Sequence, residues 1–283
     1  MKFQFSYILF LWAFCFAACD EGHLSAESPQ TLAVEGWIEN GEFPVVIVTK
    51  TLPVSTEPQN LDDLSAYLVR WAKVTVSDGE KSVVLIGRYD ENYYPPYIYT
   101  TAYMRGELGR TYTLTVEYED KILSSHTTIP QELPALDRYV VEKCEGTEDE
   151  YQIKACFHDN PHEKNHYLFF VKTAAEPTNH YLAAYMGAVN DDIIAENVEY
   201  PVYQGHQYNK NKYSPYFKAG DVASVKFAQV APSSWAFWDQ YTKSQTLQSN
   251  MFLSTSMPLP SNIEGGCGYW SGFASVVSHL IVR

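Results

Sequence analysis

Residues 32–38 read Leu-Ala-Val-Glu-Gly-Trp-Ile, and Asn40-Gly41 separates them from a second extended run at residues 44–51. Asn-Gly between two such runs is a strong signal of a β-hairpin, because both residues accept the left-handed backbone of a tight turn. A similar pattern follows, in which Asp78-Gly79 separates residues 72–77 from residues 81–87. Short strands at regular spacing, with turn residues between them, predict an all-β sandwich or barrel.

The rest of the chain continues this pattern. Tyrosine is abundant, at 22 residues, and aromatic residues make up 15% of the chain, a composition that favours strands. Helical spacing of aromatic residues occurs at residues 232–244, which we expect to form one short helix packed on a sheet. Further strands are predicted at residues 97–103, 111–118, 136–143, 151–157, 167–173, 223–230 and 272–282.

One motif indicates the kind of sandwich. Tyr112 follows Leu108-Gly109-Arg110-Thr111 and begins an alternating strand. This arrangement is typical of the tyrosine corner of immunoglobulin-like sandwiches, in which the tyrosine hydroxyl bonds back to the upstream backbone. We therefore predict an immunoglobulin-like or transthyretin-like β-sandwich at residues 32–131. Pro130 and Pro134 bracket a domain boundary, and a second β domain with the short helix is expected at residues 132–283. A single large sandwich is the alternative.

The N-terminus predicts where the protein resides. Lys2 precedes an apolar stretch that ends in Ala17-Ala18-Cys19, and small residues before the cysteine suit a signal peptidase. We expect residues 1–18 to be a signal peptide, Cys19 to be lipidated, and residues 19–31 to be a tether. An ordinary secretory signal is the alternative. After Cys19, no apolar stretch reaches the roughly 20 residues that a membrane-spanning helix needs.

Charge and cysteine content restrict the partners. The formal net charge is −14, and no stripe of basic residues occurs, so nucleic acid is excluded as a partner. We expect no cofactor. Besides Cys15 and Cys19, three cysteines remain, and in an oxidising compartment one disulfide and one free thiol are expected. Cys144 and Cys156 flank a polar turn and are the predicted pair, although Cys267 competes for either.

The sharpest chemical motif is His162-Glu163-Lys164-Asn165-His166, which fits the zinc-protease pattern H-E-x-x-H. That chemistry requires both histidines on one face of a helix. Pro161 precedes the motif and an apolar strand follows it, so a polar turn between two strands is the preferred interpretation. His162 and His166 are retained as weak metal-ligand candidates, and no catalytic residue is assigned.

Tyrosines provide the candidate ligand contacts. Tyr93, Tyr94 and Tyr97 lie in a Tyr-Tyr-Pro-Pro-Tyr segment, and aromatic rings beside Asn and Asp can stack on sugars or peptides. The alternative is that these rings are half-buried strand and loop residues.

Several landmarks line up along the chain. They are the Cys19 pattern, residues 32–38 and 105–114, Asp159-Asn160-Pro161 leading to Asn165-His166-Tyr167, residues 235–241, and Asn262-Ile263-Glu264-Gly265-Gly266 before Gly268-Tyr269-Trp270. Their order resembles the Bacteroidetes lipoprotein family called domain of unknown function 4249. In that family the stretch matching His162–His166 looks like a polar turn, and no catalytic residues are established. Asp20-Glu21 resembles the acidic surface-export signal of such lipoproteins.

The resemblance implies a function. Members commonly look like partners of TonB-dependent outer-membrane transporters. We therefore expect a binding or accessory lipoprotein, lipid-anchored to the outer membrane and facing the cell surface, with a periplasmic orientation as the alternative. A structural or adhesive envelope lipoprotein is the second functional class, and a zinc-dependent or other hydrolase is the third.

Overall fold

The computed structural model describes residues 31–51, 62–160, 162–174, 180–190, 197–205, 214–248 and 259–283. The predicted signal peptide at 1–18, Cys19 and almost all of the tether lie outside these residues. Strands dominate the described part of the chain, which confirms the predicted all-β fold. None of the helices in these ranges is long and apolar enough to cross a membrane.

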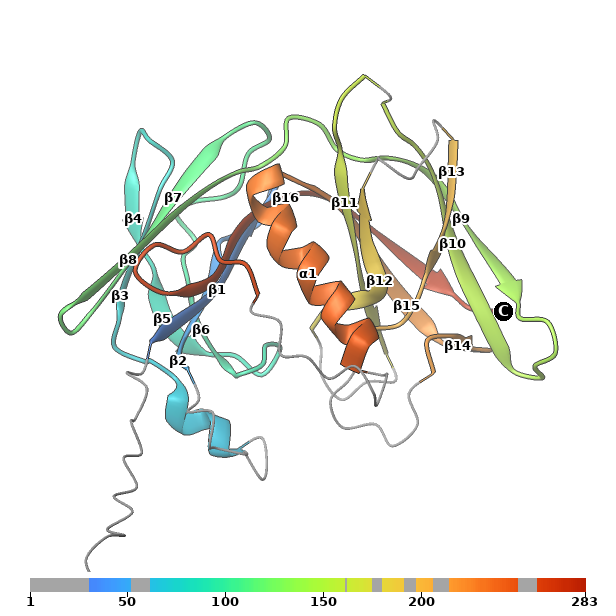
Figure 1. Ribbon diagram of the computed structural model, residues 1–283, viewed down its shortest axis with the longest axis horizontal. Coiled ribbons are helices and arrows are strands. Elements are labelled where there is room, and N and C mark those ends of the chain that lie inside the picture. Colours follow the sequence, from blue (N-terminus) through green and yellow to red (C-terminus); the bar gives the residue numbers. More distant parts are fainter. Residues whose placement is uncertain are drawn as a thin grey trace, which may run out of the picture.

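The strands of the described residues form one eight-stranded sheet and two four-stranded sheets (Figure 1). The large sheet has the order β12 (Leu182–Asn190), β11 (His166–Thr173), β15 (Val222–Val230), β16 (Cys267–Ile281), β1 (Leu32–Glu39), β2 (Val45–Lys50), β6 (Tyr97–Thr100) and β5 (Ile86–Tyr89).

The first small sheet has the order β4 (Ser82–Val84), β3 (Lys73–Ser77), β7 (Thr111–Tyr118) and β8 (Lys121–Thr128). The second contains β13 (Asn197–Val202), β10 (Glu150–His158) and β14 (Phe217–Lys218), with β9 (Ala135–Lys143) also paired to β10. The helices of the described residues are a 3-10 helix at Asp62–Tyr67 and α1 at Pro232–Gln248, which is longer than the predicted helix.

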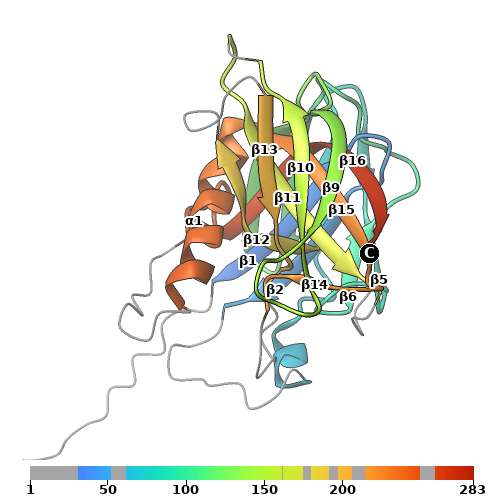
Figure 2. The same ribbon diagram turned by 90° about the vertical axis from the view of Figure 1, so that its right-hand side faces the viewer.

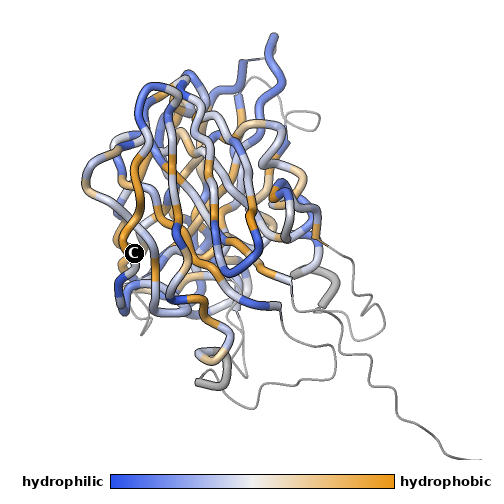
Figure 3. The backbone as a smooth tube through the Cα atoms, turned by 90° about the vertical axis from the view of Figure 1, so that its left-hand side faces the viewer, coloured by the Kyte–Doolittle hydropathy of each residue, from blue (hydrophilic) through white to orange (hydrophobic). Residues whose placement is uncertain are grey.

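Both small sheets pack on the same face of the large sheet, one at each end (Figure 1). Strand β16 shows this directly, because alternate residues of a strand point to one face. The first core, between the large sheet and the β4-β3-β7-β8 sheet of the first sandwich, contains Trp270 and Ala274. The second core, between the large sheet and the sheet around β10, is bordered by Val276 and Leu280. Helix α1 lies on the opposite face, against β12, β11 and β16 (Figure 2). Hydrophobic positions follow the strands, and many connecting loops are hydrophilic (Figure 3).

Strand β16 corrects the predicted division into two consecutive domains. It pairs in parallel with β1 along Cys267–Phe273 and antiparallel with β15 along Phe273–Ile281. Ile263 and Trp270 belong to the core of the first sandwich, although the sequence division assigns them to residues 132–283. The boundary near residue 131 does separate β8 from β9, but the two parts share one sheet and one strand.

The predicted N-terminal elements are present. Strands β1 and β2 form the antiparallel hairpin around Gly41, whose φ is 78°. The tyrosine corner is also present, because the fully buried Tyr112 hydroxyl accepts a hydrogen bond from the Glu107 N–H at 2.9 Å. The same hydroxyl donates to the Arg105 carbonyl at 3.1 Å. Tyr112 therefore holds the loop that contains Arg105 and Glu107 against the first core.

Replacement of Tyr112 by Phe should remove both bonds without changing the volume of the core. We expect a loss of about 1–3 kcal/mol in the free energy of unfolding, because the Glu107 N–H and the Arg105 carbonyl lose a partner. Denaturant unfolding of the full chain measures the effect. An unchanged midpoint would show that the corner contributes nothing to stability.

Candidate functional site

A cavity of about 840 Å³ opens on the α1 face of the large sheet. Its walls come from both halves of the chain, with β1, β2, β6 and the loop after β5 on one side and β12, β16 and α1 on the other. Its size falls within the roughly 300–1,000 Å³ of sites for small ligands. The cavity is therefore a candidate binding site made where the two parts join.

Strand β1 supplies the floor. Val34 and Ile38 point into the first core and are fully buried, so the alternate residues Glu35, Trp37 and Glu39 point to the opposite face and line the cavity. A strand in the middle of a sheet, covered on both sides, ordinarily carries apolar residues on both faces. Glu35 and Glu39 on the α1 face of β1 therefore distinguish this face from an ordinary apolar core.

Glu39 has its charge compensated. Its Oε1 accepts a hydrogen bond from Lys226 Nζ at 2.6 Å, and its Oε2 accepts one from Ser275 Oγ at 2.9 Å. Both charged side chains are largely buried, at 7% and 13% exposure. Lys226 also lies over the Tyr181 ring, with Nζ 4.5 Å from the ring centroid. This pair binds β1 to β15 across β16.

Glu35 differs from Glu39. The Glu35 side chain is exposed, and it faces the cavity. Burial among the surrounding protein atoms raises the pKa of its carboxyl. Among the described residues, no hydrogen bond or ion pair reaches this carboxylate. Its neighbour in β16 is Tyr269, whose pKa is raised far above its usual range by burial and then by the nearby Glu35 charge.

Helix α1 covers this end of the cavity with aromatic rings. Phe237 and Trp238 pack on Tyr269, with ring centroids 4.5 and 4.9 Å apart. Trp238 also donates its indole N–H to Ser271 Oγ at 3.3 Å. The prediction that this segment is a helix packed on a sheet is confirmed, and Phe237 additionally lines the cavity.

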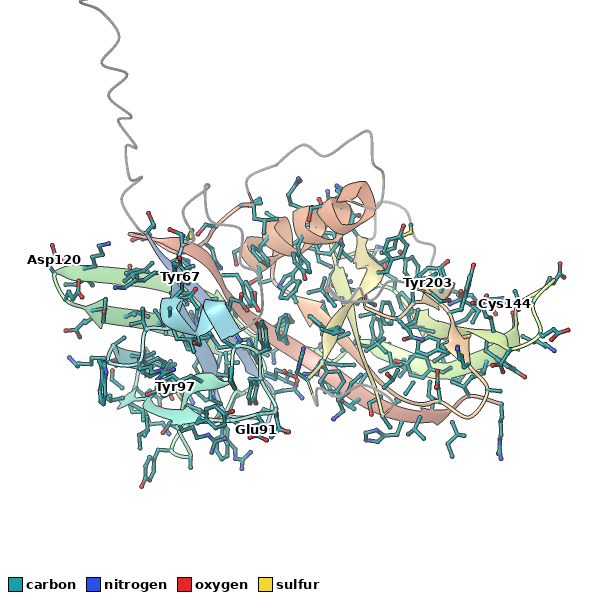
Figure 4. The ribbon with its side chains drawn as sticks, turned by 90° about the horizontal axis from the view of Figure 1, so that it is seen from below. Tyr67, Glu91, Tyr97, Asp120, Cys144 and Tyr203 are labelled. Carbon is teal, nitrogen blue, oxygen red and sulfur yellow. The ribbon has the colours of Figure 1, made fainter. Side chains whose placement is uncertain are left out.

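Two of the three candidate tyrosines belong to the site. Tyr93 and Tyr94 line the cavity, and Tyr93 packs on Trp37 with centroids 6.0 Å apart. Tyr97 does not, because its ring packs at the edge of the first core and its hydroxyl donates to the Arg70 carbonyl at 3.0 Å (Figure 4). The residues of β6 alternate, so Ile98 rather than Tyr97 faces the cavity.

The predicted disulfide between Cys144 and Cys156 is wrong. Both thiols are free, as is that of Cys267. The β9–β10 register places Cys156 opposite Arg138, six residues from Cys144, a separation of about 20 Å along the strands. A disulfide requires Cα atoms within about 7 Å. Cys144 lies instead at the start of the hairpin turn (Figure 4), where its N–H donates to the Glu150 carbonyl.

The weak metal candidates are not brought together as ligands. No helix spans His162–His166, because His162 is exposed on a turn and His166 begins β11. The His166 ring stacks on Trp235, with centroids 4.8 Å apart and planes 9° from parallel. In the part of the chain that the structure describes, no group of three metal-ligating side chains occurs. The stretch therefore forms a turn that leads into β11, and the expectation that it binds no metal stays a prediction.

Buried polar residues explain why the turn is placed here. Asp159 is 7% exposed and accepts hydrogen bonds from the Tyr167 hydroxyl at 2.7 Å and from Asn165 Nδ2 at 3.3 Å. Gln229 of β15 donates to Asn165 Oδ1 in turn. These bonds hold the β10–β11 connection against the sheet, so the Asp-Asn-Pro and Asn-His-Tyr motifs have a structural role.

Glu163→Gln should leave the free energy of unfolding within about 0.5 kcal/mol of the wild-type value, because Glu163 is exposed on this turn. Thermal unfolding and a zinc assay of the purified protein measure the outcome. Stoichiometric zinc that disappears on replacement of either histidine would contradict the assignment.

The central residues of the cavity were not selected from the sequence. Glu35 and Trp37 stand in the first predicted strand, but their significance depends on which face of that strand is covered. One signal was available, namely a charged residue in the middle of an otherwise apolar strand run. Tyr269 and Lys226 carried no comparable signal, because β16 and β15 reach β1 only through long-range pairing.

Comparison with known proteins places the chain in a family without assigning it a chemistry. No curated protein matches the chain. A family model described as a domain of unknown function, DUF4249, matches residues 23–278. That range includes every cavity-lining residue described above, and because it spans nearly the whole sequence, the chain belongs to the DUF4249 family.

Proposed function

We propose that this protein is a lipoprotein, anchored to the outer membrane through Cys19, that binds a small ligand and acts as an accessory partner of a TonB-dependent transporter. The cavity is the observation that carries the proposal. It joins the size of a small-molecule site to aromatic walls and a few polar groups, which is the usual composition of a ligand pocket.

The anchor follows from the N-terminal pattern. A basic residue, an apolar stretch and Ala17-Ala18-Cys19 together suit lipidation after cleavage. Asp20-Glu21 favours the cell-surface face of the outer membrane, where a transporter would receive the ligand. The periplasmic face remains the alternative orientation.

Capture of the full-length lipidated protein from intact membranes tests this function. We expect a TonB-dependent transporter to be enriched over a control preparation that carries an unrelated outer-membrane lipoprotein with the same tag. Mass spectrometry of the captured proteins provides the measurement. Enrichment of fimbrial or adhesin subunits in place of a transporter would contradict the proposal.

One observation favours the second functional class, a structural or adhesive envelope lipoprotein. Strand β5 ends the large sheet, and Ile86 and Tyr89 on it are both 66% exposed. An open sheet edge with apolar side chains can pair with a strand from another chain. The same capture experiment distinguishes this class, because a structural or adhesive lipoprotein should capture fimbrial or adhesin subunits.

A further inference from the structure

We propose that the cavity selects a small organic cation, with Glu35 as the counter-charge and Trp37, Phe237 and Tyr269 as aromatic walls. This inference rests on the proposed ligand-binding function and specifies the class of ligand. An ammonium or guanidinium group is the chemistry that satisfies a carboxylate within aromatic rings.

The position of Glu35 is the first step. It lies in the middle of β1, between Ile47 of β2 and Tyr269 of β16, neither of which can neutralise a carboxylate. Glu35 is accessible from the cavity and is hydrated there, so a ligand that displaces this water without a positive charge would leave the carboxylate uncompensated, which is unfavourable. The described residues supply no cation and no hydrogen bond to Glu35, and burial raises its pKa. A positively charged ligand group would supply the compensation.

The charges around the cavity are the second step. Of the described cations that line it, Lys226 is paired with Glu39, and Arg88 Nη2 lies 3.0 Å from Asp90 Oδ2. His180 also lines the cavity, and burial lowers its pKa, which disfavours the charged form of the ring. The described part of the lining therefore contains three carboxylates, Glu35, Glu39 and Glu42, against two cations that are already paired. The remaining field favours a cation over an anion.

The aromatic walls are the third step. Trp37 projects from the same face of β1 as Glu35, and Tyr269 lies across from Glu35 in β16. Phe237 from α1 packs on Tyr269 with centroids 4.5 Å apart. The faces of such rings attract cations. The cavity already holds one example, because Lys226 Nζ lies 4.5 Å from the centre of the Tyr181 ring.

Matched ligands separate charge from shape. Choline and 3,3-dimethylbutanol have nearly the same shape and differ in charge, and lysine amide and norleucine amide form a second pair that carries a primary ammonium. Quenching of tryptophan fluorescence, with Trp37 in the wall, reports binding to the full chain. We expect the cation of at least one pair to bind about tenfold or more tightly than its neutral counterpart. The pair that shows the preference identifies whether the group is quaternary or primary.

Glu35→Gln is the decisive variant. It keeps the shape of the side chain and should abolish the preference for the cation, while the midpoint of denaturant unfolding should be unchanged or higher. No hydrogen bond or ion pair of the described residues reaches the Glu35 carboxylate, so removing its charge takes no stabilising contact from the fold. Glu163→Gln is the matched control, because Glu163 is an exposed carboxylate outside the cavity lining, and it should keep the preference.

Three results would overturn the inference. They are equal affinity for the cation and its neutral counterpart, a preference that survives in Glu35→Gln, and no binding of either cation at millimolar concentration. None of them bears on capture of the transporter, which tests the proposed function without reference to charge. Failure of the ligand class and failure of the function are therefore separate outcomes.

Discussion

Trp270→Ala is expected to lower the free energy of unfolding of the whole protein by about 3–5 kcal/mol. Trp270 is fully buried in the core of the first sandwich, although it comes from the last strand of the chain. Its indole N–H donates to the Tyr112 carbonyl at 3.0 Å, and its backbone N–H donates to Asn262 Oδ1 at 2.9 Å. The substitution therefore creates a large cavity and leaves the Tyr112 carbonyl without its indole donor.

Denaturant unfolding followed by far-UV circular dichroism measures this loss. Because β16 is shared between the two halves, we expect one transition that moves as a whole. Trp71→Ala is the matched control, since Trp71 is 89% exposed, and it should change the free energy by no more than about 0.5 kcal/mol. Two separate transitions, with only the first displaced, would show that the halves are independent domains.

Cys19→Ala is expected to release the protein almost completely from the membrane fraction. The reason is that the lipid on Cys19 is the proposed anchor, and after this residue the sequence contains no apolar stretch of about 20 residues. The acidic chain also repels anionic headgroups, so a basic patch does not replace the lipid.

Fractionation of cells in high salt and then in carbonate provides the measurement for Cys19→Ala. Cys15→Ala is the matched control, because Cys15 lies within the predicted signal peptide and should leave anchoring unchanged. Tight association of Cys19→Ala with membranes after both washes would contradict the lipid anchor.

Local patterns predicted much of the fold. The β1–β2 hairpin followed from Asn40-Gly41 between two extended runs, and the tyrosine corner followed from the spacing of Leu108 and Tyr112. Both depend on residues close together in the chain, where turn geometry restricts the backbone. The helix at Pro232–Gln248 was also indicated by aromatic residues at helical spacing.

Long-range pairing was not predictable in the same way. The parallel pairing of β1 with β16 joins residues more than two hundred positions apart in the sequence. Neither strand carries a local sequence pattern that identifies the strand with which it pairs. For this reason the boundary near residue 131 became a division into two domains, whereas the final strand completes the first sandwich. The same pairing creates the cavity, so the residues of its floor could not be predicted from local sequence patterns either.

The errors among the candidate residues have physical causes. Cys144 and Cys156 flank a turn, but a hairpin pairs residues symmetrically about its turn, and the register places Cys156 opposite Arg138. Tyr97 and Tyr93 are equally aromatic, and only the alternation within β6 decides that Tyr97 faces the first core. Register and facing are properties of the assembled sheet.

The central claim is that this cavity holds the ligand, and native mass spectrometry of the full-length protein, purified gently from its own membrane, tests it most directly. Val277 lines the cavity and is 45% exposed, so Val277→Trp should obstruct the site without disturbing the core. Val222 is 44% exposed and lies outside the cavity lining, which makes Val222→Trp the control. We expect a bound small molecule on the wild-type protein and on Val222→Trp that is absent from Val277→Trp. An unliganded wild-type protein, or the same bound mass on Val277→Trp, would contradict the account.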